Sequence, residues 1–157
     1  MVFEKKLSFI IIGFLLVALS SCQKEVVEKK KGIIVVNVLD KELYDDCHIK
    51  GSIHIPFEDV QKEVPKLIDK DATVVFYCSN YMCSASGEAA KMMKKLGFKN
   101  AYAYEGGMAE WHQKGYPTEG SCKQGYLKGK MSAPEKQEDY VISVQDLKKK
   151  LDQDKKL

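Results

Sequence analysis

Two short apolar runs constrain the fold of this chain more than any other feature. Residues 33–38 read Ile-Ile-Val-Val-Asn-Val, and residues 73–77 read Thr-Val-Val-Phe-Tyr. Such runs are typical of parallel strands covered on both faces, because a strand with one exposed face alternates apolar and polar side chains. Further short strands are expected at 101–104 and at 51–56, where Pro56 ends the pairing. The sequence therefore predicts a buried parallel sheet.

Helical patterns lie between these strands. The clearest one runs from Ser84 to Leu96, where apolar residues share one face, lysines occupy the other, and Gly97 follows the last turn. Shorter helices are expected at 57–67 and at 108–114. Strands that alternate with helices predict an α/β domain. We expect a mostly parallel, five-stranded central sheet with helices on both faces.

The N-terminal segment has the pattern of a targeting signal. Two lysines precede an apolar run at 7–19, which is short for a membrane-spanning helix. The run closes as Leu19-Ser20-Ser21-Cys22 and resembles the lipobox of bacterial lipoproteins. This resemblance implies a signal peptide at 1–21, lipidation of Cys22, and an exported protein anchored by lipid to a bacterial membrane, facing the periplasm or the exterior. An ordinary signal peptide or an uncleaved anchor is the alternative.

The rest of the chain divides by composition. Residues 22–32 are polar and lysine-rich, which predicts a tether. A single domain is expected at 33–120, followed by a polar linker at 121–139. Residues 140–157 combine a short strand with an amphipathic helix. The chain is long enough for one domain of ordinary size.

All 25 basic residues are lysine, and the net charge is only +3. Without arginine, the chain cannot hold a phosphate or carboxylate by a bidentate guanidinium contact. The small net charge gives no support for a nucleic-acid partner. The cysteines do not form the paired spacing of a zinc site, so we expect neither a metal nor a cofactor.

The candidate site follows the second apolar run. Cys78 comes directly after the strand, and the loop residues Ser79 to Ser84 lead into the longest helix. The strand gives such a thiol rigid support, and loop N–H groups beside a helix N-terminus would stabilise its thiolate. The plainer interpretation of Cys78 is a core cysteine at a strand end.

Four separated motifs resemble the rhodanese family in their order and spacing, over about residues 33–118. They are Asn37-Val38-Leu39 and the segments 48–56, 74–86 and 104–117. The resemblance implies an α/β fold in which Cys78 is the catalytic residue and carries sulfane sulfur as a persulfide. The substrate-binding loop that it implies consists of Ser79, Asn80, Tyr81, Met82, Cys83 and Ser84.

The implied reaction takes sulfur from a small donor, thiosulfate or a persulfide, and passes it to a thiol or cyanide acceptor. Many rhodaneses carry a cation in this loop, commonly at the position of Cys83, whereas this loop is uncharged. A dianion such as thiosulfate would meet few positive partners, which favours a persulfide or a protein thiol as donor. The absence of arginine also disfavours the related phosphatases, whose longer loop ends in that residue.

Cys83 has two interpretations. It is a candidate resolving thiol, which would attack a persulfide or sulfenate on Cys78 and form a disulfide, or it is a small buried residue. The alternative function is therefore a non-catalytic rhodanese-like module that binds a partner protein or senses redox state through Cys78 and Cys83. With Cys22 set aside, the four remaining cysteines allow three complete pairings, and Cys47 and Cys122 could pair or stay free.

The C-terminal segment resembles a missing piece of the domain. Rhodanese domains usually begin with a short strand and helix before the run that matches residue 33, but only the tether precedes that run here. Residues 140–151 resemble this opening, and Ser143 and Asp146 have the spacing of a capping box. We expect the segment to fold back and complete the domain, because domain termini often lie close together. A loose tail or a truncated second domain is the alternative.

Overall fold

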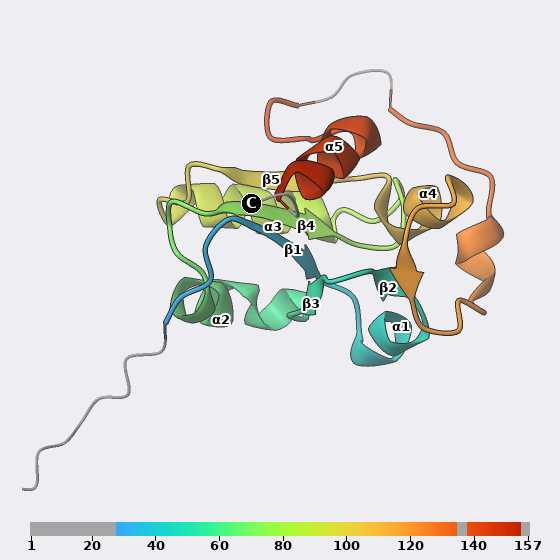
Figure 1. Ribbon diagram of the computed structural model, residues 1–157, viewed down its shortest axis with the longest axis horizontal. Helices are drawn as coiled ribbons and strands as arrows, with labels where there is room; N and C mark the ends of the chain where they lie inside the picture. Colours follow the sequence, from blue (N-terminus) through green and yellow to red (C-terminus); the bar gives the residue numbers. More distant parts are fainter. Residues whose placement is uncertain (1–27, 135–137, 155–157) are drawn as a thin grey trace, which may run out of the picture.

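The computed structural model describes residues 28–134 and 138–154, so the predicted signal peptide and Cys22 lie outside the described residues. A parallel sheet with the strand order β3-β1-β4-β5 forms the centre (Figure 1). Its strands are β1 (Ile33–Asn37), β3 (Ile53–His54), β4 (Thr73–Tyr77) and β5 (Ala101–Tyr104). The α/β fold with a parallel sheet and helices on both faces is as the sequence predicts.

The sheet has four strands in the described chain, so the expected count of five was wrong. At the edge beside β5, Val141 forms an isolated parallel bridge with Ala103. The Ala103 N–H donates to the Tyr140 carbonyl at 2.8 Å, and the Ile142 N–H donates to the Ala103 carbonyl at 2.9 Å. Pairing stops there because Ser143 begins a helix: its Oγ accepts the Asp146 N–H at 3.1 Å.

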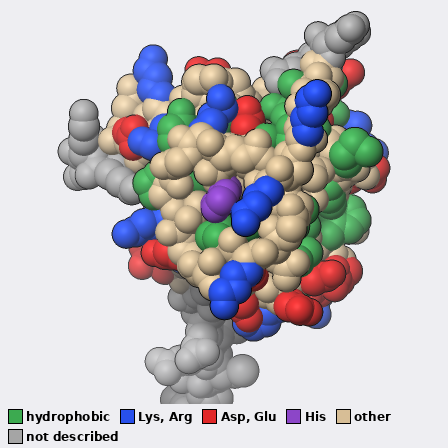
Figure 2. Space-filling view, turned by 90° about the vertical axis from the view of Figure 1, so that its right-hand side faces the viewer, with side chains coloured by type: hydrophobic (Ala, Val, Ile, Leu, Met, Phe, Trp, Pro, Cys, Tyr) green, Lys and Arg blue, Asp and Glu red, His purple; other side chains and the backbone are tan. Residues whose placement is uncertain are grey.

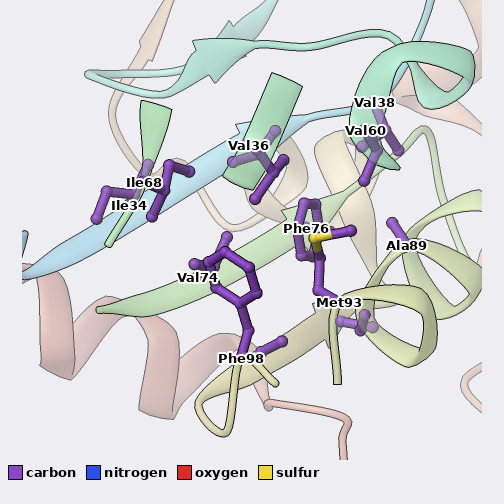
Figure 3. Packing of buried hydrophobic residues seen from close by; sticks show 14 of the residues in the cluster. Ile34, Val36, Val38, Val60, Ile68, Val74, Phe76, Ala89, Met93 and Phe98 are labelled. Atoms are coloured by element: carbon purple, nitrogen blue, oxygen red, sulfur yellow. The ribbon is translucent and has the colours of Figure 1, made fainter. Parts of the chain in front are cut away.

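One face of the sheet is covered by two helices, α2 (Val60–Leu67) and α3 (Ala85–Lys95). A 3₁₀ turn, η1 (Phe57–Asp59), leads into α2. Alternate side chains of β1 and β4 point toward these helices, and Phe76 lies near Met93 of α3 and near Val36 of β1 (Figure 3). Cys78 continues this alternation and belongs to the same buried cluster.

The opposite face is covered by α4 (Gly107–Gln113) and α5 (Val144–Asp154). Val75 and Tyr77 of β4 point to this side, where they meet Trp111 of α4 and Leu147 of α5 in a second buried cluster. Figure 1 shows α5 and α2 on opposite sides of the sheet. The C-terminal segment therefore packs on the domain, although its correspondence to the opening of other domains stays a prediction.

A second, smaller sheet lies beside the first. It pairs β2 (His48–Ile49) with β6 (Thr118–Glu119) in the antiparallel sense, next to α1 (Lys41–Asp46). A disulfide joins Cys47 to Cys122, whose Cα atoms are 4.6 Å apart. The carboxylate of Asp46 accepts two further N–H groups of this segment, from Lys123 and Gln124.

The segment predicted as a polar linker is therefore fixed to the domain at its start. It contains a 3₁₀ turn, η2 (Gly125–Lys128), in which Leu127 is buried. The Gln113 side chain of α4 donates to the carbonyls of Leu127 and Gly129, both at 2.9 Å. In the described part of the chain, none of the helices has the length and apolar content needed to cross a membrane.

Candidate active site

The carboxyl end of β4 carries Cys78 to the edge of the sheet. Cys78 is completely buried, and the loop that follows it connects β4 to α3. Figure 2 shows the side of the molecule at the right of Figure 1, toward which β1 and β4 point. On this side lysines are scattered among uncharged surface, and acidic side chains gather at one edge (Figure 2).

The start of α4 holds the first two residues of the loop. The Met108 N–H donates to the Cys78 carbonyl at 2.9 Å, and the Ala109 N–H donates to the Ser79 carbonyl at 2.9 Å. Gly107 makes this approach possible: its φ is +60°, and a Cβ at this position would lie 2.5 Å from the Cys78 carbonyl oxygen. The turn at 105–107 therefore positions the loop.

A carboxylate anchors the middle of the loop. The hydroxyls of Tyr81 and Tyr104 donate to the same oxygen of Glu110, at 3.1 and 3.0 Å. Burial and, next, the nearby Glu110 charge raise the pKa of Tyr81 to about 12. Sequence reasoning did not single out Glu110; its place on the helix that follows the Glu105-Gly106-Gly107 turn was the available signal.

The tip of the loop is a local turn. The Asn80 side-chain oxygen accepts the Met82 N–H at 2.9 Å, and the Asn80 carbonyl accepts the Cys83 N–H at 3.0 Å. This turn exposes 93% of the Met82 side chain. A surface pocket of about 380 Å³ adjoins the loop and is lined by Tyr81, Glu110, Gln113, Lys114, Met131 and Ala133.

The two loop thiols lie side by side and differ in their surroundings. The Cys78 thiol donates to the Cys83 carbonyl at 3.1 Å and lies 3.5 Å from the Ser86 hydroxyl. A hydrogen bond to the Cys83 sulfur, and then burial, raise the pKa of Cys78. The same hydrogen bond lowers the pKa of Cys83 to about 5, helped by the N–H groups of Ala85 and Ser79.

The charge distribution therefore differs from the one expected. Sequence reasoning directed the loop N–H groups at Cys78, whereas two of them, from Ser79 and Ala85, bond the Cys83 sulfur. The N–H of Ser86 is the backbone donor that lowers the pKa of Cys78. The reason is that Cys78 points inward from the end of β4, whereas Cys83 is only partly buried against the same hydrophobic cluster.

The remaining residues of the predicted substrate-binding loop are continuous in the chain. Ser79 to Ser84 form one continuous loop between β4 and α3, and the Ser84 carbonyl accepts the Glu88 N–H at 3.0 Å. Among residues 28–134 and 138–154, no three or more His, Cys, Asp or Glu side chains gather where they could hold a metal ion.

Two motif residues outside the loop make structural hydrogen bonds. The His48 ring bonds the Tyr44 carbonyl at 2.8 Å through Nδ1. Trp111 is only 2% exposed, and its Nε1–H donates to the Pro117 carbonyl at 2.9 Å. These contacts support the small sheet beside the site and leave the two thiols as its reactive groups.

Comparison with known proteins agrees with this geometry. The family model of the rhodanese-like domain matches residues 22–114, and the chain belongs to this family. It is similar to thiosulfate sulfurtransferase GlpE of Coxiella burnetii, with 31% identity over 83 residues, which are 53% of this chain and 75% of that protein.

Solved structures show the same fold. The BH2092 protein from Bacillus halodurans is 33% identical with a TM-score of 0.54, over 58% of this chain and 66% of that one. The Rhodanese_3-like domain of the Alr3790 protein from Anabaena is 26% identical with a TM-score of 0.52, over 55% of this chain and 98% of that one. These matches define the fold and the family, and they include a relative named as a sulfurtransferase.

Proposed function

We propose that this protein is an exported sulfurtransferase that carries sulfane sulfur as a persulfide on Cys78. The observation that carries the proposal is the position of this thiol: it follows β4, and α4 bonds the carbonyls of Cys78 and Ser79. A thiol held at a fixed place beside a second thiol can form a covalent sulfur intermediate. The relatives named thiosulfate sulfurtransferase support the same reaction class.

The surroundings of the loop favour a donor with less negative charge at its sulfur than the thiosulfate dianion. Glu110 lies directly behind Tyr81, and the loop contains no cation. The loop itself offers no cation to a dianion such as thiosulfate beside this carboxylate, whereas a persulfide with an organic group brings less negative charge to the loop. The pocket beside Tyr81 would hold that organic group. The substrates proposed are therefore a small persulfide donor and a thiol acceptor, on a small molecule or on a partner protein.

Incubation of the purified protein with a persulfide donor tests this function. Mass spectrometry should show a gain of one sulfur atom on the wild-type chain, and cyanide should remove it as thiocyanate. The Cys78→Ser/Cys83→Ser double variant, which lacks both loop thiols, should take up no sulfur and release no thiocyanate. A wild-type chain that takes up no sulfur from either a persulfide or thiosulfate would rule the proposal out.

Export and lipid anchoring are part of the proposal. They are supported by the lipobox-like sequence that ends at Cys22 and, separately, by the Cys47–Cys122 disulfide, because disulfides persist mainly outside the cytoplasm. Labelled palmitate fed to cells that make the full chain should be incorporated into the wild type and not into Cys22→Ser. Equal labelling of both chains, or none of either, would contradict lipidation at Cys22.

The hydrogen bond between the two loop thiols favours a second candidate, a redox module. In this case Cys83 would resolve a sulfenate on Cys78 and form a disulfide. Treatment with hydrogen peroxide, followed by a dithiol, should then form and break a Cys78–Cys83 bond without any sulfur uptake from persulfides. Sulfur uptake that cyanide reverses would instead favour the transferase.

A further inference from the structure

The two loop thiols differ in their access to an external donor. Cys78 is 0% exposed, and its sulfur is closed in by the Cys83 carbonyl at 3.1 Å and the Ser86 hydroxyl at 3.5 Å. Cys83 is half-buried, next to the exposed tip residue Met82. A donor that approaches the loop from solvent can therefore reach Cys83 more readily than Cys78.

Their electrostatic surroundings differ in the same direction. The Cys78 sulfur faces two carbonyl oxygens, of Cys83 and of Asn80 at 3.9 Å, and these oxygens disfavour a thiolate. For Cys83, the N–H of Ala85, at the start of the 11-residue helix α3, and the N–H of Ser79 at the other end of the loop instead help to lower the pKa. These surroundings favour the thiolate on Cys83 over one on Cys78.

We propose that Cys83 is the first nucleophile of sulfur transfer and passes the sulfur to Cys78. This inference rests on the proposed function, in which Cys78 carries the persulfide. It differs from the resolving role considered for Cys83 on sequence grounds, because no disulfide forms. Cys83 then acts as the entry residue of the site, and Cys78 acts as the protected store.

In the first step, the Cys83 thiolate attacks the outer sulfur of a donor persulfide. The S–S bond of the donor breaks, and its electron pair leaves with the donor thiolate. In the second step, the Cys78 sulfur attacks the outer sulfur on Cys83; the new S–S bond forms as the old one breaks. The Cys78 proton passes to the departing Cys83 sulfur, so that Cys83 leaves as a thiol. Each step exchanges one S–S bond for another, so no oxidant or reductant is consumed.

The order of the two thiols suits exchange chemistry. A thiolate is the attacking species, and at neutral pH Cys83 supplies it in high fraction. A thiol of low pKa is also the better leaving group, which favours the second transfer, from Cys83 to Cys78. The reverse order would require a buried, protonated thiol to attack a donor that it does not touch.

Single-turnover loading of full-length variants with glutathione persulfide at pH 7 tests the order. Cys78 and Cys83 lie on one tryptic peptide, 71–91, so the variants decide which of them takes the sulfur. We expect Cys78→Ser still to gain one sulfur, on Cys83. We expect Cys83→Ser to load roughly tenfold more slowly or worse, because an ordinary thiol is only a few per cent ionised at this pH. Cys83→Ala is a second variant, and circular dichroism checks that each variant is folded.

The outcomes separate the inference from the function on which it rests. Rapid loading of Cys83→Ser together with no loading of Cys78→Ser would overturn the entry role and keep the Cys78 persulfide. Release of hydrosulfide from the wild type with a Cys78–Cys83 disulfide would overturn the second transfer. The absence of sulfur on the wild type and on both variants would reject the sulfurtransferase itself.

Discussion

Gly107 lies where the first turn of α4 touches the active loop. Its φ of +60° is in the left-handed region, and an added Cβ would lie 2.5 Å from the Cys78 carbonyl oxygen. Gly115 has a similar φ of +68°, but an added Cβ there would have no heavy atom within 4 Å. Substitutions at these two glycines therefore distinguish the cost of backbone strain from the cost of direct contact with the loop.

Gly107→Ala should displace the loop and abolish most sulfur loading. Its cost should be roughly 2 kcal/mol or more, because contact with the loop backbone adds to the strain of the left-handed conformation. Gly115→Ala should cost only about 1 kcal/mol, from its conformation alone, and should keep wild-type loading. Urea unfolding and the loading assay measure both effects. Equal losses of activity in the two variants would contradict a specific role for the Gly107 contact.

Cys83 should react as a thiolate well below neutral pH. Its pKa is lowered to about 5, so the thiolate increases as pH rises through that value and is nearly complete by pH 7. The rate of Cys83 alkylation by iodoacetamide should therefore rise between about pH 4 and 6 and then level off, since the thiolate is the reactive form. Mass spectrometry of quenched samples measures this alkylation rate at each pH.

The matched control is Cys78→Ala. It removes the hydrogen bond that is the largest cause of the lowered pKa, so the midpoint for Cys83 should move to higher pH. An unchanged midpoint would show that the loop N–H groups alone hold the thiolate. A midpoint near 8.5 in the wild type would contradict the lowered pKa altogether.

At the scale of elements, α5 supplies part of the core although it comes last in the chain. Leu147 is 0% exposed and lies in the same cluster as Trp111 and Val75. The pattern of residues 140–151 predicted a strand and a helix, and the structure has the helix together with a single bridge. The bridge stays short because the cap at Ser143 starts the helix two residues after Val141.

Leu147→Ala should therefore destabilise the whole domain. Removal of a fully buried leucine side chain costs about 2–5 kcal/mol, since lost burial and a cavity add up. Gln145→Ala is the control on the same helix; Gln145 is exposed, and the change should stay within about 0.5 kcal/mol. Urea unfolding, monitored by tryptophan fluorescence, measures the loss of stability, because Trp111 lies in the same cluster as Leu147. A loss below about 1 kcal/mol for Leu147→Ala would show that α5 is dispensable to the core.

At the scale of the whole molecule, one covalent bond ties distant parts together. The Cys47–Cys122 disulfide links two residues that are 75 positions apart in the sequence. It fixes to the domain the segment that contains the buried residue Leu127. Sequence left this pairing open, because spacing alone does not select one of three pairings. In the structure, the end of α1 lies close to the end of β6, and this proximity pairs Cys47 with Cys122.

Reduction of this disulfide should lower the free energy of unfolding by about 2–4 kcal/mol, because the unfolded chain regains the entropy of a long loop. Unfolding in urea with and without a strong reductant measures the change. The Cys47→Ser/Cys122→Ser double variant should be less stable than the wild type and should not respond to reductant. A response of the double variant would mean that another thiol pair is responsible.

The sequence by itself determined the class of fold and the place of the site. Continuous β-branched runs require cover on both faces, and one cysteine directly after such a run marks the carboxyl edge of the sheet. The position of the loop from Ser79 to Ser84 was also predictable, because it depends on local residue types.

Only the tertiary structure distinguished the surroundings of the two loop sulfurs. The full burial of Cys78 and the partial burial of Cys83 depend on how β4 and α3 pack, and the Glu110 contact with Tyr81 depends on the approach of α4. Sidedness, burial and charge pairing arise between segments that are distant in the chain. Hydrogen-bond donors bonded to a sulfur, and not its position in a motif, set which thiol is ionised.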